Sequence, residues 1–254
     1  MPPPAQQALE YAREIARALA TAPGGLDLSS VIVHGSVGFG DYVAGRSDLD
    51  VLIVGEVSAD GVAEVADSIC AVPAAAGLEG LERSLVSHHD IASLEPLRPF
   101  RLHVNLQGET RRVVPGDGHA GDEDLTLHYA VARTCGITIW GTPADEVFPP
   151  QPHALVTRAL LSELHWAAEK AEPCYAVLNA ARAWAFAHEG AMLSKLGGWM
   201  WARRHDGPAH LLDLALANYL APQSDTVQWP ALQGDIDSFL DTVSTSLQVK
   251  AERS

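Results

Sequence analysis

Two periods of hydrophobic spacing divide this chain into a mixed first half and a helical second half. Leu9, Ala12 and Ile15 recur every three or four residues, which predicts an amphipathic helix over 5–21. Short apolar runs typical of strands follow it. Expected strands cover Val31–His34, Leu49–Val54, Leu81–Ser87 and Phe100–Gln107, and expected helices begin after Asp60 and at Leu125, the second ending at Gly136. The first two strands are close enough in the chain to pair as neighbours.

The strand expected at Phe100–Gln107 alternates plainly. Its apolar residues Leu102, Val104 and Leu106 share one face, because successive side chains of a strand point to opposite sides. The other face carries Arg101, His103, Asn105 and Gln107.

The pattern changes near residue 150. Thr142-Pro143 predicts a helix N-cap followed by proline, and Pro149-Pro150 cannot continue a helix. The remaining sequence predicts helices over 153–170, 174–189, 193–204, 208–220 and 231–247. We therefore expect an α+β protein: a mixed-sheet domain over 1–150 and an all-α helical bundle over 151–254, with a cleft between them.

The charge balance favours some partners over others. Seventeen Lys and Arg against 32 Asp and Glu give a formal net charge of −15 over 254 residues. Such a chain repels a nucleic-acid backbone and attracts a cationic small molecule. We therefore expect no nucleic-acid partner.

The cysteines and the first residues indicate where the protein works. Cys70, Cys135 and Cys174 are isolated, so the sequence contains neither a zinc spacing nor a disulfide framework. The first twenty residues carry charges at helical intervals where an export signal needs an apolar stretch. We expect a cytoplasmic protein with no membrane partner.

One segment carries the chemistry. Gly35-Ser36 follows a strand, and Ser47-Asp48-Leu49-Asp50 opens the next strand. Asp48 and Asp50 project to one face and can bind Mg²⁺, which prefers carboxylate and phosphate oxygens. Gly35 lets the backbone approach a triphosphate, and the Ser36 hydroxyl can hold its phosphates. The combination predicts a nucleotidyltransferase site.

Other interpretations of these residues are weaker. A Gly-Ser turn or an Asp-x-Asp pair alone is most often an ordinary turn or strand end. The glycines of 35–40 have the wrong order for a dinucleotide fingerprint, and no P-loop lysine follows them. His88-His89-Asp90 is expected to be a polar strand end, because adjacent strand residues point apart and make a poor metal site.

From Val31 to Tyr219 the sequence resembles the polymerase-β-like nucleotidyltransferases, and within them the aminoglycoside adenylyltransferases that act on streptomycin and spectinomycin. The segments that carry the resemblance are the motif above, Leu81-Glu82 with Val86 and 88–91, Gly141–Phe148, Leu178–Trp184, Gly190 and Ser194-Lys195. The resemblance implies transfer of AMP from ATP, as cosubstrate, to an antibiotic hydroxyl.

The resemblance also implies residue roles. Asp48 and Asp50 would bind Mg²⁺, and Glu82 would be the catalytic base. Gly35, Ser36, Ser47, Lys195 and Tyr219 would bind ATP. Gln107, Glu172 and Tyr175 stand where the family contacts its acceptor, but family members that accept both antibiotics have tryptophan and aspartate at the first two positions. Spectinomycin is therefore the expected acceptor over streptomycin, and the protein is expected to be a monomer.

Two alternatives keep part of this hypothesis. The same transfer could go to a hydroxyl of a protein, an RNA or another small molecule, although RNA fits poorly with a charge of −15. A module that only binds nucleotide or antibiotic is the second alternative, and the intact set of Ser36, Asp48, Asp50 and Glu82 argues against it.

Overall fold

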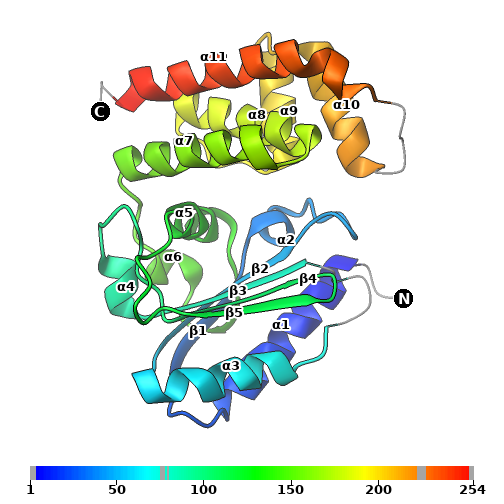
Figure 1. The fold of residues 1–254 in the computed structure, drawn as a ribbon. Helices are drawn as coiled ribbons and strands as arrows, with labels where there is room; N and C mark the ends of the chain where they lie inside the picture. The colour runs from blue at the N-terminus through cyan, green and yellow to red at the C-terminus, as the bar shows by residue number, and fades with distance from the viewer. Residues whose placement is uncertain (1–3, 75–77, 79, 222–226, 252–254) are drawn as a thin grey trace. The chain divides into compact units, whose positions relative to one another are not determined.

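The computed structural model consists of two compact units, Met1–Pro150 and Gln151–Ser254 (Figure 1). It describes residues 4–74, 78, 80–221 and 227–251. The first unit combines a mixed sheet with helices and the second is helical, so the expected α+β fold class is confirmed.

The N-terminal unit is built on a six-stranded sheet with the strand order β5-β4-β3-β2-β1-β6. Only β2 and β3 pair in parallel among these neighbours; the other pairs are antiparallel. The strands are β1 (Asp27–Val33), β2 (Leu49–Glu56), β3 (Gly80–Val86), β4 (Leu102–Gln107), β5 (Thr110–Pro115) and β6 (Ile137–Gly141). The expected pairing of the first two strands is confirmed.

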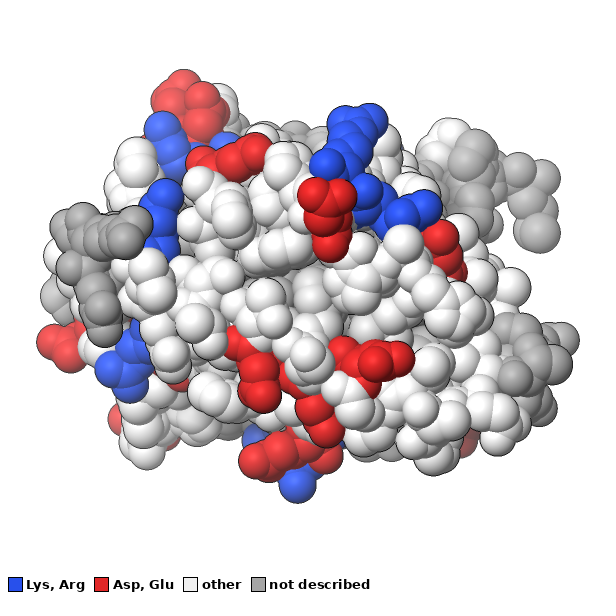
Figure 2. All heavy atoms as spheres, turned by 90° about the horizontal axis from the view of Figure 1, so that it is seen from above, with Lys and Arg blue, Asp and Glu red and all other residues white. Residues whose placement is uncertain are grey.

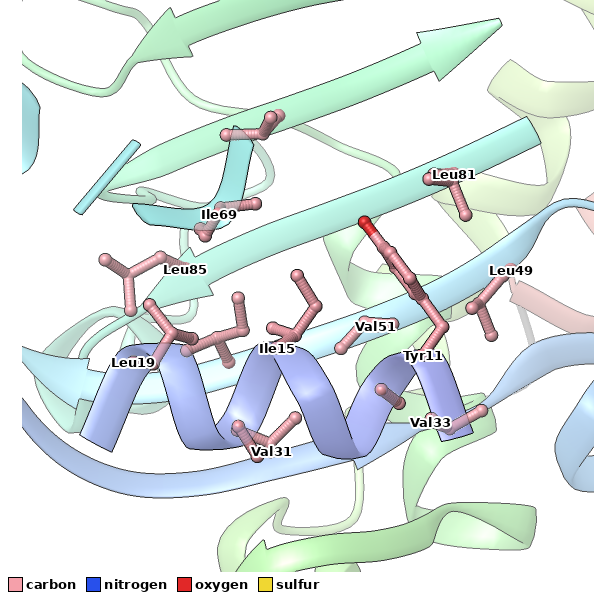
Figure 3. Close-up of a cluster of buried hydrophobic side chains, with 14 of the residues drawn as sticks. Tyr11, Ile15, Leu19, Val31, Val33, Leu49, Val51, Ile69, Leu81 and Leu85 are labelled. Carbon is pink, nitrogen blue, oxygen red and sulfur yellow. The ribbon is translucent and has the colours of Figure 1, made fainter. Parts of the chain in front are cut away.

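One face of the sheet is covered by α1 (Pro4–Ala20) and α3 (Val62–Ala71), the latter preceded by a short turn of 3-10 helix at Ala59–Gly61. Figure 3 shows Tyr11, Ile15 and Leu19 of α1 lying over Val31, Val51 and other apolar side chains of the strands. A buried arginine, Arg83 of β3, donates to the Tyr11 hydroxyl at 2.8 Å and to the Val104 carbonyl at 2.8 Å. These bonds tie α1 to the middle of the sheet.

The opposite face is covered by α5 (Leu125–Cys135) and α6 (Ala144–Val147), and the short helices α2 (Gly35–Phe39) and α4 (His88–Ala92) lie beside it. Leu125, Tyr129 and Ala132 of α5 pack on Leu52 and Val86 of the strands. The apolar layer covers only part of this face. The polar residues that remain form the candidate site described below.

The C-terminal unit is built around one central helix, α8. It contains α7 (His153–Lys170), α8 (Pro173–Glu189), α9 (Lys195–Arg204), α10 (Ala209–Leu220), a 3-10 turn at Trp229–Leu232 and α11 (Gln233–Ala251). The other four α-helices all contact α8, whose many buried alanines permit close approach. Among the described residues, no helix is long and apolar enough to cross a membrane.

The differences from the sequence-based expectation are short, local elements. The chain at 88–92 is not a strand end: Ser87 and Asp90 form a reciprocal capping box that starts helix α4. Gly35-Ser36 opens a five-residue helix rather than a turn. The short helix near 143 begins at Ala144, one residue later than expected, with Pro143 as its N-cap. Strands β5 and β6, both at the sheet edges, were not predicted.

Candidate active site

A row of polar side chains crosses three adjacent strands of the N-terminal sheet. Asp50 of β2 is paired in register with Glu82 of β3, and Glu82 with Asn105 of β4. Registered neighbours project to the same face. Their sequence neighbours Leu49 and Leu81 belong to the core under α1 and α3, so the row lies on the face that α5 covers.

The turn into α2 is packed against Asp50. Gly35 has a φ of +62°, and a Cβ added there would overlap the Oδ2 atom of Asp50. The backbone N–H of His34 donates to the Asp50 carbonyl at 3.1 Å. Ser36 Oγ lies 3.5 Å from the Asp48 carbonyl. The structure therefore brings the predicted Gly-Ser segment to both predicted carboxylates.

Asp48 lies one residue before β2 and is held from the other side. Its Oδ1 accepts a hydrogen bond from Gln107 Nε2 at 3.2 Å, and a Cβ added at Gly80 would overlap the same carboxylate. Ser47 is buried, and its hydroxyl accepts the Val43 N–H at 3.0 Å. Gln107 thus contacts a candidate metal ligand, and Ser47 shapes the loop that presents Asp48.

The carboxylates of Asp48 and Asp50 suit a magnesium ion whose remaining ligands come from a nucleotide and from water. No group of three or more His, Cys, Asp or Glu suited to a metal occurs in the part of the chain that the structure describes. Mg²⁺ in nucleotide enzymes is commonly held by one or two carboxylates, with phosphate oxygens and waters completing the shell. Gly35 packs against the Asp50 carboxylate and Gly80 against the Asp48 carboxylate. Both carboxylates therefore occupy space that the side chain of a larger residue would fill.

Glu82 is surrounded by titratable groups. His128 Nε2 on α5 lies 3.9 Å from Glu82 Oε1 and 3.0 Å from Asp124 Oδ2. Burial raises the pKa of Glu82; the charge of His128 opposes that rise and Asp124 adds to it. His103 lowers the pKa of Glu82 and Asp122 raises it, each more weakly. Glu82 is therefore a carboxylate whose basicity is increased by its surroundings.

Two neighbouring histidines, His34 and His128, have pKa values shifted in opposite directions. His34 is buried, and desolvation followed by the charge of His128 holds its pKa well below the usual range. Burial also acts to lower the pKa of His128, but Glu82 and Asp124 reverse this and hold it well above the usual range. The two rings meet edge to face, with centroids 5.0 Å apart. The surroundings therefore shift the pKa values of two adjacent imidazoles in opposite directions.

The C-terminal unit brings three other predicted residues together. Lys195, the first residue of α9, places its Nζ 4.3 Å from the ring centre of Tyr175 and 5.2 Å from that of Tyr219. The Tyr175 hydroxyl donates to Glu163 Oε1 at 2.8 Å, and Asn179 Nδ2 donates to the same oxygen at 2.9 Å. Glu172 is exposed at the N-cap of α8. Tyr175 therefore supports Lys195 through its ring and uses its hydroxyl within the protein.

Several residues of these clusters were not predicted from the sequence to belong to a site. Asn105 lies on the polar face of its strand, so the alternation in the sequence contained a signal for it. His128 follows Asp124 by one helical turn, but nothing in the sequence places either beside Glu82. Glu163 and Asn179 likewise meet Tyr175 only through helix packing.

Comparisons with known proteins match the fold of the chain and the sequence of its C-terminal part. The structure of spectinomycin adenyltransferase AAD(9) from Enterococcus faecialis, with ATP and spectinomycin, superposes on this chain with a TM-score of 0.67 at 15% sequence identity. The match covers 96% of this chain and 99% of that one. Residues 146–246 match the family described as aminoglycoside adenylyltransferase, C-terminal domain. Curated protein sequences contain no significant match.

The match of residues 146–246 and the fold of the whole chain indicate an enzyme of the nucleotidyltransferase class. Its residues 146–246 form a domain of the aminoglycoside adenylyltransferase kind. The resemblance found in the sequence is thereby confirmed.

Proposed function

We propose that this enzyme transfers AMP from ATP to a hydroxyl of spectinomycin or a closely related aminocyclitol, with release of pyrophosphate and resistance as the consequence. The observation that carries the proposal is the register of β2 and β3, which pairs Asp50 with Glu82. Asp48 lies two residues before Asp50, and Gly35 packs against the Asp50 carboxylate. This arrangement supplies metal ligands and a base side by side.

The N-terminal unit would bind the metal and the reacting phosphate. Asp48 and Asp50 would hold Mg²⁺. When bound, this ion would neutralise negative charge on the phosphates. Ser36 and the backbone around Gly35 would hold the phosphate oxygens of ATP. Gln107 would hold Asp48 in place through the hydrogen bond to its Oδ1.

Glu82 would act as the general base. The acceptor oxygen attacks the α-phosphorus of ATP while its proton passes to a Glu82 carboxylate oxygen. The bond between the α-phosphorus and the bridging oxygen breaks, and that oxygen leaves with pyrophosphate. The raised pKa of Glu82 suits this role, because a stronger base accepts the hydroxyl proton more readily.

The C-terminal unit would supply Lys195 and Tyr219 to ATP and Glu172 to the cationic acceptor. A lysine ammonium stabilises negative charge on phosphate oxygens. Glu172 is exposed and carries the charge that an amino or guanidino group would meet. Gln107 offers no aromatic face for streptomycin, which supports spectinomycin as the preferred acceptor.

The test is a mass measurement of antibiotics incubated with the enzyme, ATP and Mg²⁺. Spectinomycin should gain one AMP, with a kcat/KM at least about tenfold above that for streptomycin, a difference of about 1.4 kcal/mol. A panel of other aminoglycosides serves as comparison. Pyrophosphate release without any antibiotic adduct would point to another acceptor, and neither product would contradict the proposed reaction.

Two variants connect the activity to the site. Asp50→Asn should abolish adduct formation, since it removes a negatively charged metal ligand, whereas Asp60→Asn, at an exposed position before α3, should retain full activity. Glu82→Gln should lower kcat by about 10² to 10⁴ with ATP still bound. The matched control is Glu64→Gln on α3, which covers the opposite face of the sheet. Loss of ATP affinity in Glu82→Gln would make Glu82 a metal ligand instead of a base.

A further inference from the structure

His128 stands over the polar row of the sheet in a place where most of its helix contributes apolar packing. Its neighbours Leu125, Tyr129 and Ala132 on α5 lie in the core against the strands. The His128 side chain has only 12% of its surface exposed, so burial of an imidazole there requires compensating contacts.

Those contacts are with carboxylates. Nε2 of His128 lies 3.0 Å from Asp124 Oδ2, one helical turn earlier, and 3.9 Å from Glu82 Oε1. The first distance is a hydrogen bond, and the second is an ionic contact that needs no shared proton. The third nearby carboxylate is Asp50, in register with Glu82 on the neighbouring strand.

The position of His128 can offset the repulsion between two carboxylates of the row. Asp50 and Glu82 are like charges on adjacent strands, and their repulsion favours any rotamer of Glu82 that turns away. The His128 imidazole, held on α5 by Asp124, meets the Glu82 carboxylate from the helix side, and in its protonated form it attracts that carboxylate. Because apolar packing fixes α5 on the sheet, the His128 imidazole favours a single position of the Glu82 carboxylate.

We propose that His128 is a positioning residue for Glu82, which holds the carboxylate of the base in place beside Asp50 through their ionic contact. The inference rests on the proposed role of Glu82. His128 itself does not touch the reacting atoms in this assignment. Its effect on the reaction is therefore expected to disappear when Glu82 cannot act as a base.

The test is a double-mutant cycle in the full-length enzyme with ATP, Mg²⁺ and spectinomycin. His128→Gln should lower kcat by about tenfold, while KM for ATP and for spectinomycin each stay within about twofold. In the Glu82→Gln background the same substitution should lower kcat by less than twofold, because residues that act through one another are not additive. His89→Gln, at an exposed position on α4, is the matched control and should leave kcat unchanged.

Two results would overturn the inference: equal losses in both backgrounds, which indicate a structural role, or an unchanged kcat in His128→Gln. Should that variant fail to fold, Asp124→Asn removes the anchor at a half-exposed site, and it should show the same non-additivity with Glu82→Gln. Failure of the proposed function gives a different pattern, since the unaltered enzyme would then form no adduct or Glu82→Gln would be fully active.

Discussion

Single residues at the site are constrained by close packing as well as by chemistry. Gly35 and Gly40 both have positive φ, +62° and +80°, but only Gly35 has a neighbour where a Cβ would be. That neighbour is the Oδ2 atom of Asp50. Substitutions at Gly35, the first residue of α2, and at Gly40, its C-cap, therefore distinguish the cost of an unfavourable backbone conformation from the effect of displacing a carboxylate.

Gly35→Ala should lower kcat/KM by at least about 10², because the added methyl moves Asp50, and Gly40→Ala should change it by less than about threefold. Each substitution should destabilise the fold by about 1 to 2 kcal/mol, since alanine disfavours positive φ. Steady-state kinetics and thermal melting of the pair check this. Equal activity losses in both variants would show that backbone strain, not the Asp50 contact, limits the reaction.

Tyr175 provides a second contrast at this scale, between a ring and its hydroxyl. Tyr175→Phe keeps the aromatic face that Lys195 Nζ approaches at 4.3 Å and loses the bond to Glu163. KM for ATP should change by less than about threefold in this variant. Tyr175→Leu removes the ring and should raise KM about 5- to 10-fold, the effect of a cation–π contact worth about 1 kcal/mol. A Phe variant as impaired as Leu would instead assign the function to the hydroxyl.

At the scale of elements, α1 depends on one buried polar contact with the sheet. Arg83 donates to the Tyr11 hydroxyl at 2.8 Å in a setting where the guanidinium has little access to water. Removing that acceptor leaves part of a buried cation without its hydrogen bond.

Tyr11→Phe should therefore lower the free energy of unfolding by about 1 to 3 kcal/mol. Tyr129→Phe on α5 is the matched control: its buried hydroxyl has no hydrogen-bond partner among the described residues, so the change should be below about 0.5 kcal/mol. Urea denaturation measures both. Similar losses for the two tyrosines would mean that the bond from Arg83 contributes no more to stability than a buried hydroxyl without a partner does.

For the whole molecule, the net charge of −15 should influence which substrates accumulate near the enzyme. Figure 2 shows acidic side chains in several groups over one face, with basic side chains between them. Surface charges of this kind act at long range and are screened by salt.

KM for spectinomycin, a cation, should rise several-fold between about 0.01 M and 0.15 M salt, where the Debye length falls from about 30 to 8 Å. KM for the negatively charged complex of ATP with Mg²⁺ should stay constant or fall over the same range, which makes it an internal control. Initial rates at fixed pH measure both values. A parallel rise in both would indicate a general effect of salt on the enzyme and not attraction of the cation.

The long helices, four of the six strands and the placement of Asp48 and Asp50 on one face were predictable, because short-range geometry determines them. Residues two apart on a strand share a face whatever surrounds them, so Asp48 and Asp50 could be paired from spacing alone. The helices of the C-terminal unit follow from apolar residues at three- and four-residue intervals. Glu82 was identified only through resemblance to a family, because a single glutamate in a strand has no distinguishing pattern.

Tertiary structure decided which of these residues meet. The pairing of Asp50 with Glu82 depends on the register of β2 and β3, and a shift by one residue would turn either side chain into the core. That register is selected by the packing of both faces of the sheet together, a sum over many distant residues. His128 beside Glu82, and Glu163 beneath Tyr175, depend likewise on how helices dock. Spacing along the chain therefore specified the chemical groups of this protein, whereas long-range packing specified their neighbours.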